Sequence, residues 1–263
     1  MIRILAFMLL CAGPASADVL RLAVTTSFEN SGLSEVLIPA FEAASGDEVR
    51  VIVVGTGRAL KLGQAGDVDA VLTHAPEAEH AAVEAGHFSH RREVMYNDFV
   101  LLGPADDPAS IAEAAGPGEA LTRIAATQSL FASRGDESGT HKAELALWEL
   151  AGIEPGQASG LWYRETGSGM GATLNTGVAL DAYILSDRAS WLTFGNRGDH
   201  VILVEGDPAL FNQYAFLPVS PERHVSTARD AAARFETWLT GPGQGVIAGY
   251  KLEGEALFEP NAK

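Results

Sequence analysis

The order of apolar and polar stretches in the first third of the chain predicts strands and helices in strict alternation. Three short apolar runs read as buried strands, and the stretches between and after them have the 3.6-residue spacing of amphipathic helices. The expected strands are 19–25, 49–54 and 70–73, and the expected helices are 32–44, 58–65 and about 77–86. A β-α-β-α-β order predicts a parallel sheet covered by helices on both faces.

A second α/β unit is predicted in the remainder of the chain. Its expected strands are 99–102, 130–133, 201–204 and 214–219, and its expected helices are 110–122 with an interruption at 116–118, 141–151, about 171–186 and 226–239. The last helix would begin at Ser226 or Thr227 and turn Phe235, Trp238 and Leu239 inward. Because 214–219 is expected to return to the first sheet, the second unit would be inserted within the first.

Polar turns follow several of these strands at their carboxyl ends, where open parallel sheets bind ligands. The turns are Thr25-Thr26-Ser27, Gly55-Thr56-Gly57 and the segment 133–140. A fourth turn, 167–171, is rich in glycine and precedes a helix, but it lacks the full G-x-G-x-x-G spacing of a dinucleotide site. We expect all four turns to face one cleft between two lobes, with Met170 packing inside rather than binding.

The segment Ser133-Arg134-Gly135-Asp136-Glu137-Ser138-Gly139-Thr140 has the composition of an anion socket. It places a guanidinium, hydroxyls and free backbone N–H groups at the start of a helix, and this arrangement favours a tetrahedral anion. The whole chain carries a formal charge of −16, so this local chemistry does not follow from general composition. The same charge argues against nucleic acid as a partner, since every phosphate would be repelled.

The first 17 residues have the pattern of an export signal. Arg3 is followed by the apolar run 4–11, which is too short to span a bilayer, and Ala15-Ser16-Ala17 fits a cleavage site before Asp18. Lipidation at Cys11 is a minor alternative, because Leu10 stands where a small residue is usual. No later segment is apolar enough to cross a membrane, so we expect a periplasmic or extracellular mature chain without thiols.

Several of these segments together resemble one known family. The segments are Val24–Ser27 with Asn30–Leu33, Val54–Gly57, Met95–Val100, Ser133–Thr140 and Gly169–Gly171. In combination they resemble the tungstate-binding proteins of ABC uptake systems, which are periplasmic binding proteins of the two-lobed, hinged kind. The resemblance covers nearly the whole mature chain. The piece from Arg134 to Thr140 is also similar to the phosphate-binding relatives.

The resemblance implies an α/β, type II periplasmic-binding-protein fold in which each lobe is a mostly parallel sheet flanked by helices. Lobe 1 would comprise 18–100 and 213–263, and lobe 2 would comprise 101–212. It further implies a monomeric transport component, with no enzyme activity, cofactor or metal, that captures an oxyanion in the cleft and delivers it to a membrane permease. The implied ligand contacts are Thr25, Thr26, Ser27, Thr56, Arg134, Ser138, Gly139 and Thr140.

The protonation state of the anion separates the candidate ligands. Tungstate and molybdate are dianions without a proton at neutral pH, so their sites need donors only. Phosphate usually keeps a proton, so it binds better where one carboxylate accepts a hydrogen bond from that proton. If Asp136 faces the anion, phosphate is favoured. If Asp136 instead pairs with Arg134 or caps the helix, a fully deprotonated oxyanion is favoured.

Two other classes of protein remain possible on the residues alone. A hydrolase would need a nucleophile and a base, for which Ser138 with His141 is the one local candidate, but no G-x-S-x-G elbow surrounds Ser138. A sensor module could use the same socket. Four histidines at 74, 80, 87 and 90 match no zinc pattern, and we interpret them as surface or capping residues.

Overall fold

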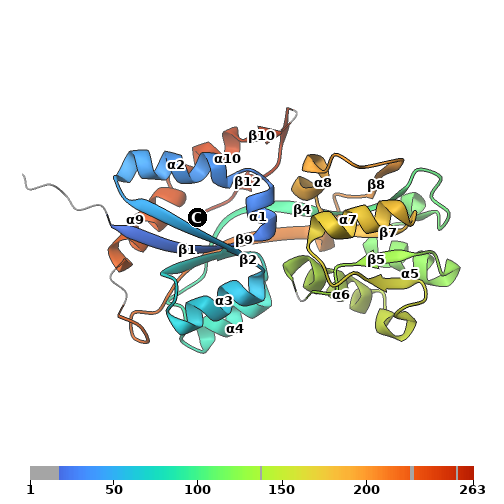
Figure 1. Cartoon of the computed structure of the whole chain (residues 1–263), viewed down its shortest axis with the longest axis horizontal. Coiled ribbons are helices and arrows are strands. Elements are labelled where there is room, and N and C mark those ends of the chain that lie inside the picture. Colours follow the sequence, from blue (N-terminus) through green and yellow to red (C-terminus); the bar gives the residue numbers. More distant parts are fainter. Residues whose placement is uncertain (1–17, 137, 226–227, 253) are drawn as a thin grey trace, which may run out of the picture.

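The computed structural model describes residues 18–136, 138–225, 228–252 and 254–263. The expected export signal, with Cys11, and the expected N-cap at 226–227 lie outside these residues. Two α/β lobes stand side by side and are joined by two long strands, β4 (Arg92–Pro104) and β9 (Phe211–Pro218) (Figure 1). The predicted two-lobed α/β fold is thereby confirmed.

Lobe 1 is built on three parallel strands that β9 extends in the antiparallel sense. The order is β2-β1-β3-β9, and Thr25 at the end of β1 lies opposite Val54 at the end of β2. The elements are β1 (Val19–Thr25), α1 (Thr26–Asn30), α2 (Ser34–Ser45), β2 (Glu48–Val54), α3 (Thr56–Ala65), β3 (Ala70–Thr73), α4 (Pro76–Glu84), α9 (Arg229–Leu239), α10 (Pro242–Gly249), β10 (Lys251–Leu252), β11 (Glu255–Ala256) and β12 (Glu259–Pro260).

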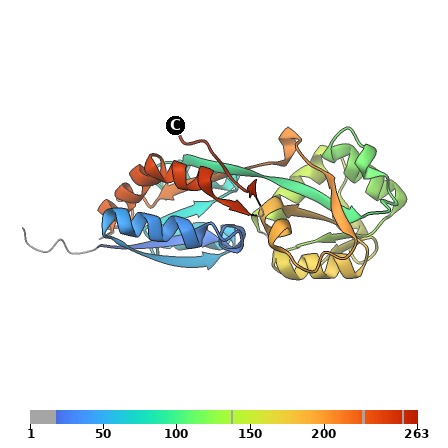
Figure 2. The same cartoon turned by 90° about the horizontal axis from the view of Figure 1, so that it is seen from above.

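Apolar cores cover both faces of the lobe 1 sheet, as expected for parallel strands. On one face Phe41, Phe216 and Phe235 pack together, and the C-terminal helices α9 and α10 lie beside α2 (Figure 2). On the other face α3 and α4 cover residues such as Val71 and Phe88. The chain thus returns from lobe 2 to complete the lobe in which it began.

Lobe 2 is a second sheet of the order β4-β7-β5-β6, with β8 paired to β4. Its strands β5, β6 and β7 are parallel, while β4 runs antiparallel to β7 and β8. The elements are η1 (Ile111–Glu113), α5 (Pro117–Thr127), β5 (Phe131–Ser133), α6 (Gly139–Leu150), η2 (Pro155–Ala158), β6 (Tyr163–Glu165), α7 (Met170–Ala179), β7 (Tyr183–Asp187), α8 (Arg188–Thr193), β8 (His200–Val204) and η3 (Pro208–Leu210).

The strand β4 belongs to both sheets. It pairs with β9 from Arg92 to Asp98 and with β7 from Phe99 to Leu102. Asn97 lies opposite Asn212 of β9, one residue before the last pair with β9, so it is next to the point where the partner changes. Of β4, the sequence predicted only the part at 99–102, because the polar residues at 96–98 interrupt the apolar pattern. The predicted limits of the two lobes, at 100 and 212, fall within or beside these shared strands and stay a prediction.

Three local predictions were wrong. The expected helix 171–186 ends at Ala179, and the apolar run after it forms the buried strand β7. The helix expected over 110–122 was predicted with an interruption at 116–118, and the break is confirmed but the extent was wrong. The part before the break is the short turn η1, and α5 begins at Pro117, because proline suits the first turn of a helix, and continues to Thr127. The polar stretch after Thr25, expected as a turn, forms the short helix α1. Strand β6 and helix α10 were not predicted.

No helix in the described part of the chain has the length and apolar content that a bilayer crossing requires.

A buried carboxyl lies directly beneath the start of α6. Glu144 is 2% exposed and accepts hydrogen bonds from Ser133 Oγ at 2.8 Å, Tyr163 OH at 2.7 Å and Trp148 Nε1 at 3.3 Å. Burial nevertheless raises the pKa of Glu144 to about 7, more than these three donors lower it. The network ties the end of β5, which precedes Arg134, to the body of α6.

Replacement Glu144→Gln should change how stability depends on pH. The wild-type carboxyl ionises near 4.5 when unfolded but near 7 when folded, so its contribution to the free energy of unfolding falls as pH rises between these values. The fall is about 3 kcal/mol, and glutamine cannot show it. Urea unfolding at pH 4.5, 5.5, 6.5 and 7.5 should therefore show that the free energy of unfolding of the variant rises, relative to that of the wild type, as the pH increases. A difference that is constant across this range would contradict the assignment.

Candidate functional site: an anion site between the lobes

Arg134 is the buried cation of the candidate site. It follows β5 directly and is 4% exposed, and its Nη2 donates to Asp136 Oδ2 at 2.5 Å. Asp136 Oδ1 also accepts from the Ser138 N–H at 3.2 Å. Burial favours the neutral carboxyl, but the hydrogen bonds from Ser138 and Arg134 outweigh it and hold the pKa of Asp136 below its usual value. Asp136 is thus engaged within its own loop, and it orients Arg134.

The N-terminus of α6 supplies the next donors. Ser138 is the N-cap, and its Oγ accepts from the His141 N–H at 3.2 Å. Gly139 and Thr140 form the first turn, where backbone N–H groups point out of the helix without intrahelical acceptors. Thr140 is 1% exposed, and within the described structure its Oγ1 has no hydrogen-bond partner. The predicted helix start at this loop is therefore confirmed, although the Ser138 hydroxyl is used in capping.

Lobe 1 contributes hydroxyls from two adjacent strand ends. Thr25 is buried and caps α1 by accepting from the Phe28 N–H at 3.3 Å, while Thr26 is half-buried. Ser27 is buried and lies 3.0 Å from Thr25 Oγ1. Thr56 opens α3 beside them, and its buried Oγ1 likewise lacks a partner among residues 18–136, 138–225, 228–252 and 254–263. Both predicted polar turns thus lie at one edge of the sheet.

His74 brings the two lobes together. It follows β3 and is 5% exposed, and its Nε2 lies 2.9 Å from Ser27 Oγ. On its other side the ring packs against Gly139 so closely that a Cβ on Gly139 would stand 2.6 Å from His74 Cε1. The turn at 25–27 and the loop at 133–140 therefore meet at this ring. The interpretation of His74 as a surface or capping residue was wrong.

Further buried polar groups surround this contact. Asp187 caps α8 by accepting from the Ser190 N–H at 2.9 Å, and its other oxygen has no partner in the described structure. Burial raises the pKa of Asp187, against the attraction of Arg134. Tyr214 stacks on His74 with ring centroids 4.6 Å apart. Sequence reasoning missed His74, Asp187 and Tyr214, yet two of them end strands in the way that the predicted site residues do.

The glycine-rich turn at 167–171 and the residue before it are hydrogen-bonded to the loop that carries Arg134. The Ser168 N–H donates to the Arg134 carbonyl at 3.2 Å, and the Thr166 N–H donates to the Ser133 carbonyl at 2.9 Å. Gly169 is the N-cap of α7, while Met170 is 3% exposed within the lobe 2 core. The prediction that Met170 packs inside is confirmed. The N-terminus of α7 thus lies beside the loop that carries Arg134, in addition to that of α6.

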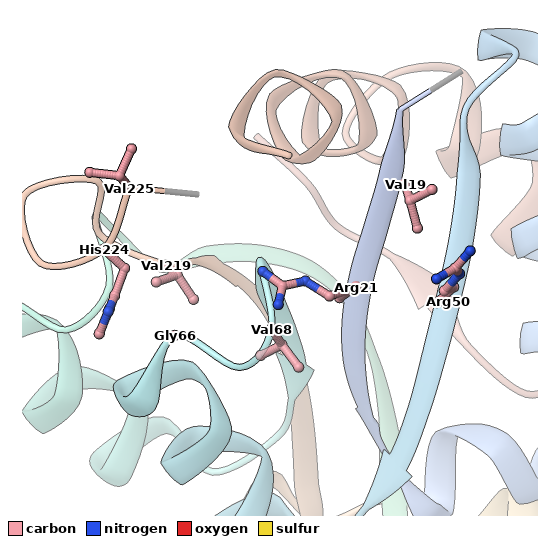
Figure 3. A pocket seen from close by; sticks show the side chains of 8 residues that line it. All are labelled: Val19, Arg21, Arg50, Gly66, Val68, Val219, His224 and Val225. Atoms are coloured by element: carbon pink, nitrogen blue, oxygen red, sulfur yellow. The ribbon is translucent and has the colours of Figure 1, made fainter. Parts of the chain in front are cut away.

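A separate surface cavity of about 360 Å³ lies at the opposite end of the lobe 1 sheet (Figure 3). Its lining includes the side chains of Val19 and Arg21 near the amino end of β1. Arg21 is already paired there, because it donates to Asp69 through Nε at 3.1 Å and Nη2 at 2.7 Å. The cavity is remote from the carboxyl strand ends, so we do not assign it to the candidate site.

The interlobe site offers more unpaired donors than unpaired acceptors, and Asp187 Oδ2 is its unpaired carboxylate acceptor in the described structure. Three buried donor atoms on two lobes, Thr56 Oγ1, Arg134 Nε and Thr140 Oγ1, have no acceptor among the described residues. An unmade buried hydrogen bond costs roughly 1–3 kcal/mol, so each of these atoms calls for an acceptor that the described residues do not supply. An oxyanion supplies the acceptors that all three require.

Two hinged α/β lobes with donors between them define the class of two-lobed binding proteins. In agreement, residues 12–242 match the family described as the PBP superfamily domain. The chain belongs to that superfamily.

Individual relatives narrow the assignment. The chain is 42% identical to the tungstate-binding protein TupA of Peptoclostridium acidaminophilum over 92% of its own length and 85% of that protein. It is also 42% identical to an ABC transporter anion-binding protein of Haloferax volcanii, over 95% and 74% of the two chains. The structure of TupA from Desulfovibrio alaskensis G20 matches with a TM-score of 0.82 at 44% identity, over 94% and 100%. Within the superfamily, the chain belongs to the family of the TupA proteins.

The unpartnered hydroxyl of Thr140 should contribute nothing to stability in the absence of an anion. Replacement Thr140→Val keeps the shape of the side chain, so we expect an unchanged or higher free energy of unfolding. The matched control is Thr73→Val, since the buried Thr73 hydroxyl donates to Glu79 at 2.7 Å and its loss should cost about 1–2 kcal/mol. Urea unfolding of both variants in anion-free buffer checks this, and a comparable loss in both would remove the functional reading of Thr140.

Proposed function

We propose that this protein captures tungstate between its two lobes and presents it to an ABC transporter permease. The observation that carries the proposal is the group of buried donors on both lobes, Thr56, Arg134 and Thr140, which have no acceptor among the described residues. The relatives named for tungstate binding and for anion binding in ABC transport support the same ligand class.

The position of Asp136 supports a fully deprotonated anion. Its carboxylate is held by Arg134 and the Ser138 N–H, so it orients donors and is not directed at a ligand proton. Tungstate and molybdate carry no proton at neutral pH and need donors only. Their similar charge and shape make molybdate the closest alternative ligand.

Ligand capture would shift a hinge equilibrium. Each lobe supplies some of the donors, so only the closed arrangement completes the set around the anion. The ligand then stabilises closure by its difference in affinity for the two arrangements. The shared strands β4 and β9 are the connection about which the lobes would move. Export to the periplasm and a monomeric state belong to the same proposal.

Phosphate is the second candidate ligand, and Asp187 is the observation in its favour. This carboxyl is fully buried within electrostatic reach of Arg134, and one of its oxygens has no partner in the described part of the chain. Such an oxygen can accept a hydrogen bond from the proton that phosphate keeps. Asp187→Asn removes this acceptor, so it would weaken phosphate binding while leaving tungstate binding in place.

Replacement Arg134→Ala should weaken tungstate binding at least tenfold. A charged hydrogen bond removed from a desolvated site is worth roughly 1.5–3 kcal/mol, and the change also leaves Asp136 without its cation. Titration calorimetry measures the affinity. Arg123→Ala is the control, because Arg123 also pairs with a carboxylate in lobe 2 but is 30% exposed. Equal affinity for the wild type and Arg134→Ala would refute the proposed site.

Thermal unfolding against a panel of anions tests the ligand itself. A ligand that binds only the folded state must raise the melting temperature as its concentration rises. We expect a large increase with tungstate or molybdate. Sulfate is also a dianion without a proton but is smaller, so its effect reports how far the spacing of the donors selects by size. An increase with phosphate alone would transfer the assignment to the second candidate, and no increase with any of them would overturn the proposed function.

A further inference from the structure

His74 contacts three parts of the molecule that capture must coordinate. Its Nε2 lies 2.9 Å from Ser27 Oγ in the hydroxyl-rich turn of lobe 1. Its Nδ1 lies 2.9 Å from Asn212 Oδ1 on the shared strand β9. Its Cε1 edge faces Gly139, the first residue of α6 in lobe 2. The ring is therefore in contact with the ligand turn, the connection between the lobes and the opposite lobe at once.

The hydrogen bonds through this ring have a definite direction. Asn212 Nδ2 donates to Asn97 Oδ1 at 2.6 Å, so Asn212 Oδ1 is left to accept from His74 Nδ1–H. His74 Nε2 is then the acceptor for the Ser27 hydroxyl. The chain of donors runs from Ser27 through His74 and Asn212 to Asn97, across the pair of residues next to the point where β4 changes partner.

The direction of this chain changes the role of Ser27. Its one proton is committed to His74, while Tyr214 OH donates to its oxygen at 3.3 Å. Thr25 Oγ1 lies 3.0 Å from Ser27 Oγ, so with the Ser27 proton committed Thr25 donates to Ser27. Ser27 and Thr25 therefore hold the turn in place, and Thr26 is the hydroxyl of the turn that is left to face an anion. Burial, with the nearby charge of Arg134, lowers the pKa of His74 to about 4, so the ring is neutral and can accept.

The contact with Gly139 is equally specific. A Cβ there would lie 2.6 Å from His74 Cε1 and 3.1 Å from both ring nitrogens, distances that require a movement. The ring cannot yield easily, since it is hydrogen-bonded at both nitrogens and stacked on Tyr214. Gly139 does not have a positive φ, so its backbone gives no reason for glycine. Space for His74 is the reason that the structure offers.

We propose that His74 is a positioning residue for anion capture, which links the hinge pair Asn97–Asn212 to the ligand turn and provides the surface on which Gly139 rests when the lobes close. This inference rests on the proposed function for the identity of the anion. The contact exists only between closed lobes, so its loss should increase the rate of anion release and leave the rate of association with the open form unchanged.

The first test is a double-mutant cycle on the contact. Gly139→Ala places a methyl group in the space of the ring and should weaken tungstate affinity at least tenfold, through the release rate. His74→Ala removes the ring, so adding Gly139→Ala to it should cost less than twofold. Gly245→Ala in α10 is the control, because a Cβ there meets nothing within 4 Å. Equal losses from Gly139→Ala with and without the ring would overturn the contact.

The second test reads the hydrogen bonds of the ring. Glutamine can place an amide oxygen near the position of Nε2, so His74→Gln should recover part of the affinity that His74→Ala loses. His90→Gln is the control, since His90 is half-exposed and pairs with Glu236 at 2.7 Å away from the site. Equal affinities for His74→Gln and His74→Ala would show that the hydrogen bond to Ser27 contributes nothing and would overturn the positioning role.

Lobe separation distinguishes failure of this inference from failure of the proposed function. Dyes on cysteines introduced at the exposed positions Glu84 of α4 and Glu149 of α6 would report the distance by energy transfer. Gly139→Ala should lower the closed population with or without an anion. If tungstate leaves the distance between the dyes in the wild type unchanged, the proposed function fails. The contact between His74 and Gly139 is then still tested by comparing Gly139→Ala with the wild type without an anion. If Gly139→Ala leaves the closed population unchanged, this inference fails whatever the anion does.

Discussion

The structure depends on two strands that belong to both lobes. Backbone hydrogen bonds tie β4 to β9 on the lobe 1 side and β4 to β7 on the lobe 2 side, so neither lobe can detach from the other. In the proposed capture, these strands are the connection about which the lobes would change their angle. The candidate site lies beside this crossing, where a small change of angle would bring the donors together or separate them. The affinity for the anion and the angle between the lobes would therefore depend on each other.

Arg134 can be buried because a carboxylate in the same loop compensates its charge. A lone buried guanidinium would be costly, and Asp136 neutralises it across two residues of the same loop. The pair leaves Arg134 Nε without an acceptor among the described residues while holding the side chain in one position. Selection among anions can then rest on the number of donors and their spacing rather than on net attraction, which suits a protein whose overall charge is strongly negative.

The sequence predicted the parts of the site that follow a local rule. Thr25, Thr56 and Arg134 were predicted as contacts because each lies at or just after the end of an apolar run, and such runs end at one edge of a parallel sheet. His74 obeys the same rule at the end of β3, but its hydrogen-bond partner Asn212 is 138 residues away, and no local pattern reveals that pairing. The helix expected through 180–186 failed for a different reason, since a short apolar run fits a buried strand as well as a buried helix.

The order of strands also limits the order in which the chain can fold. All strands of the lobe 2 sheet come from β4 to β8, so that sheet can be completed as soon as residue 204 is available. The lobe 1 sheet needs β9 beside β3, which closes a loop of more than a hundred residues. Closing so long a loop is entropically slow unless the intervening chain is already compact. Prior folding of lobe 2 shortens that loop, so the inserted lobe acts as a folding aid for the lobe that encloses it.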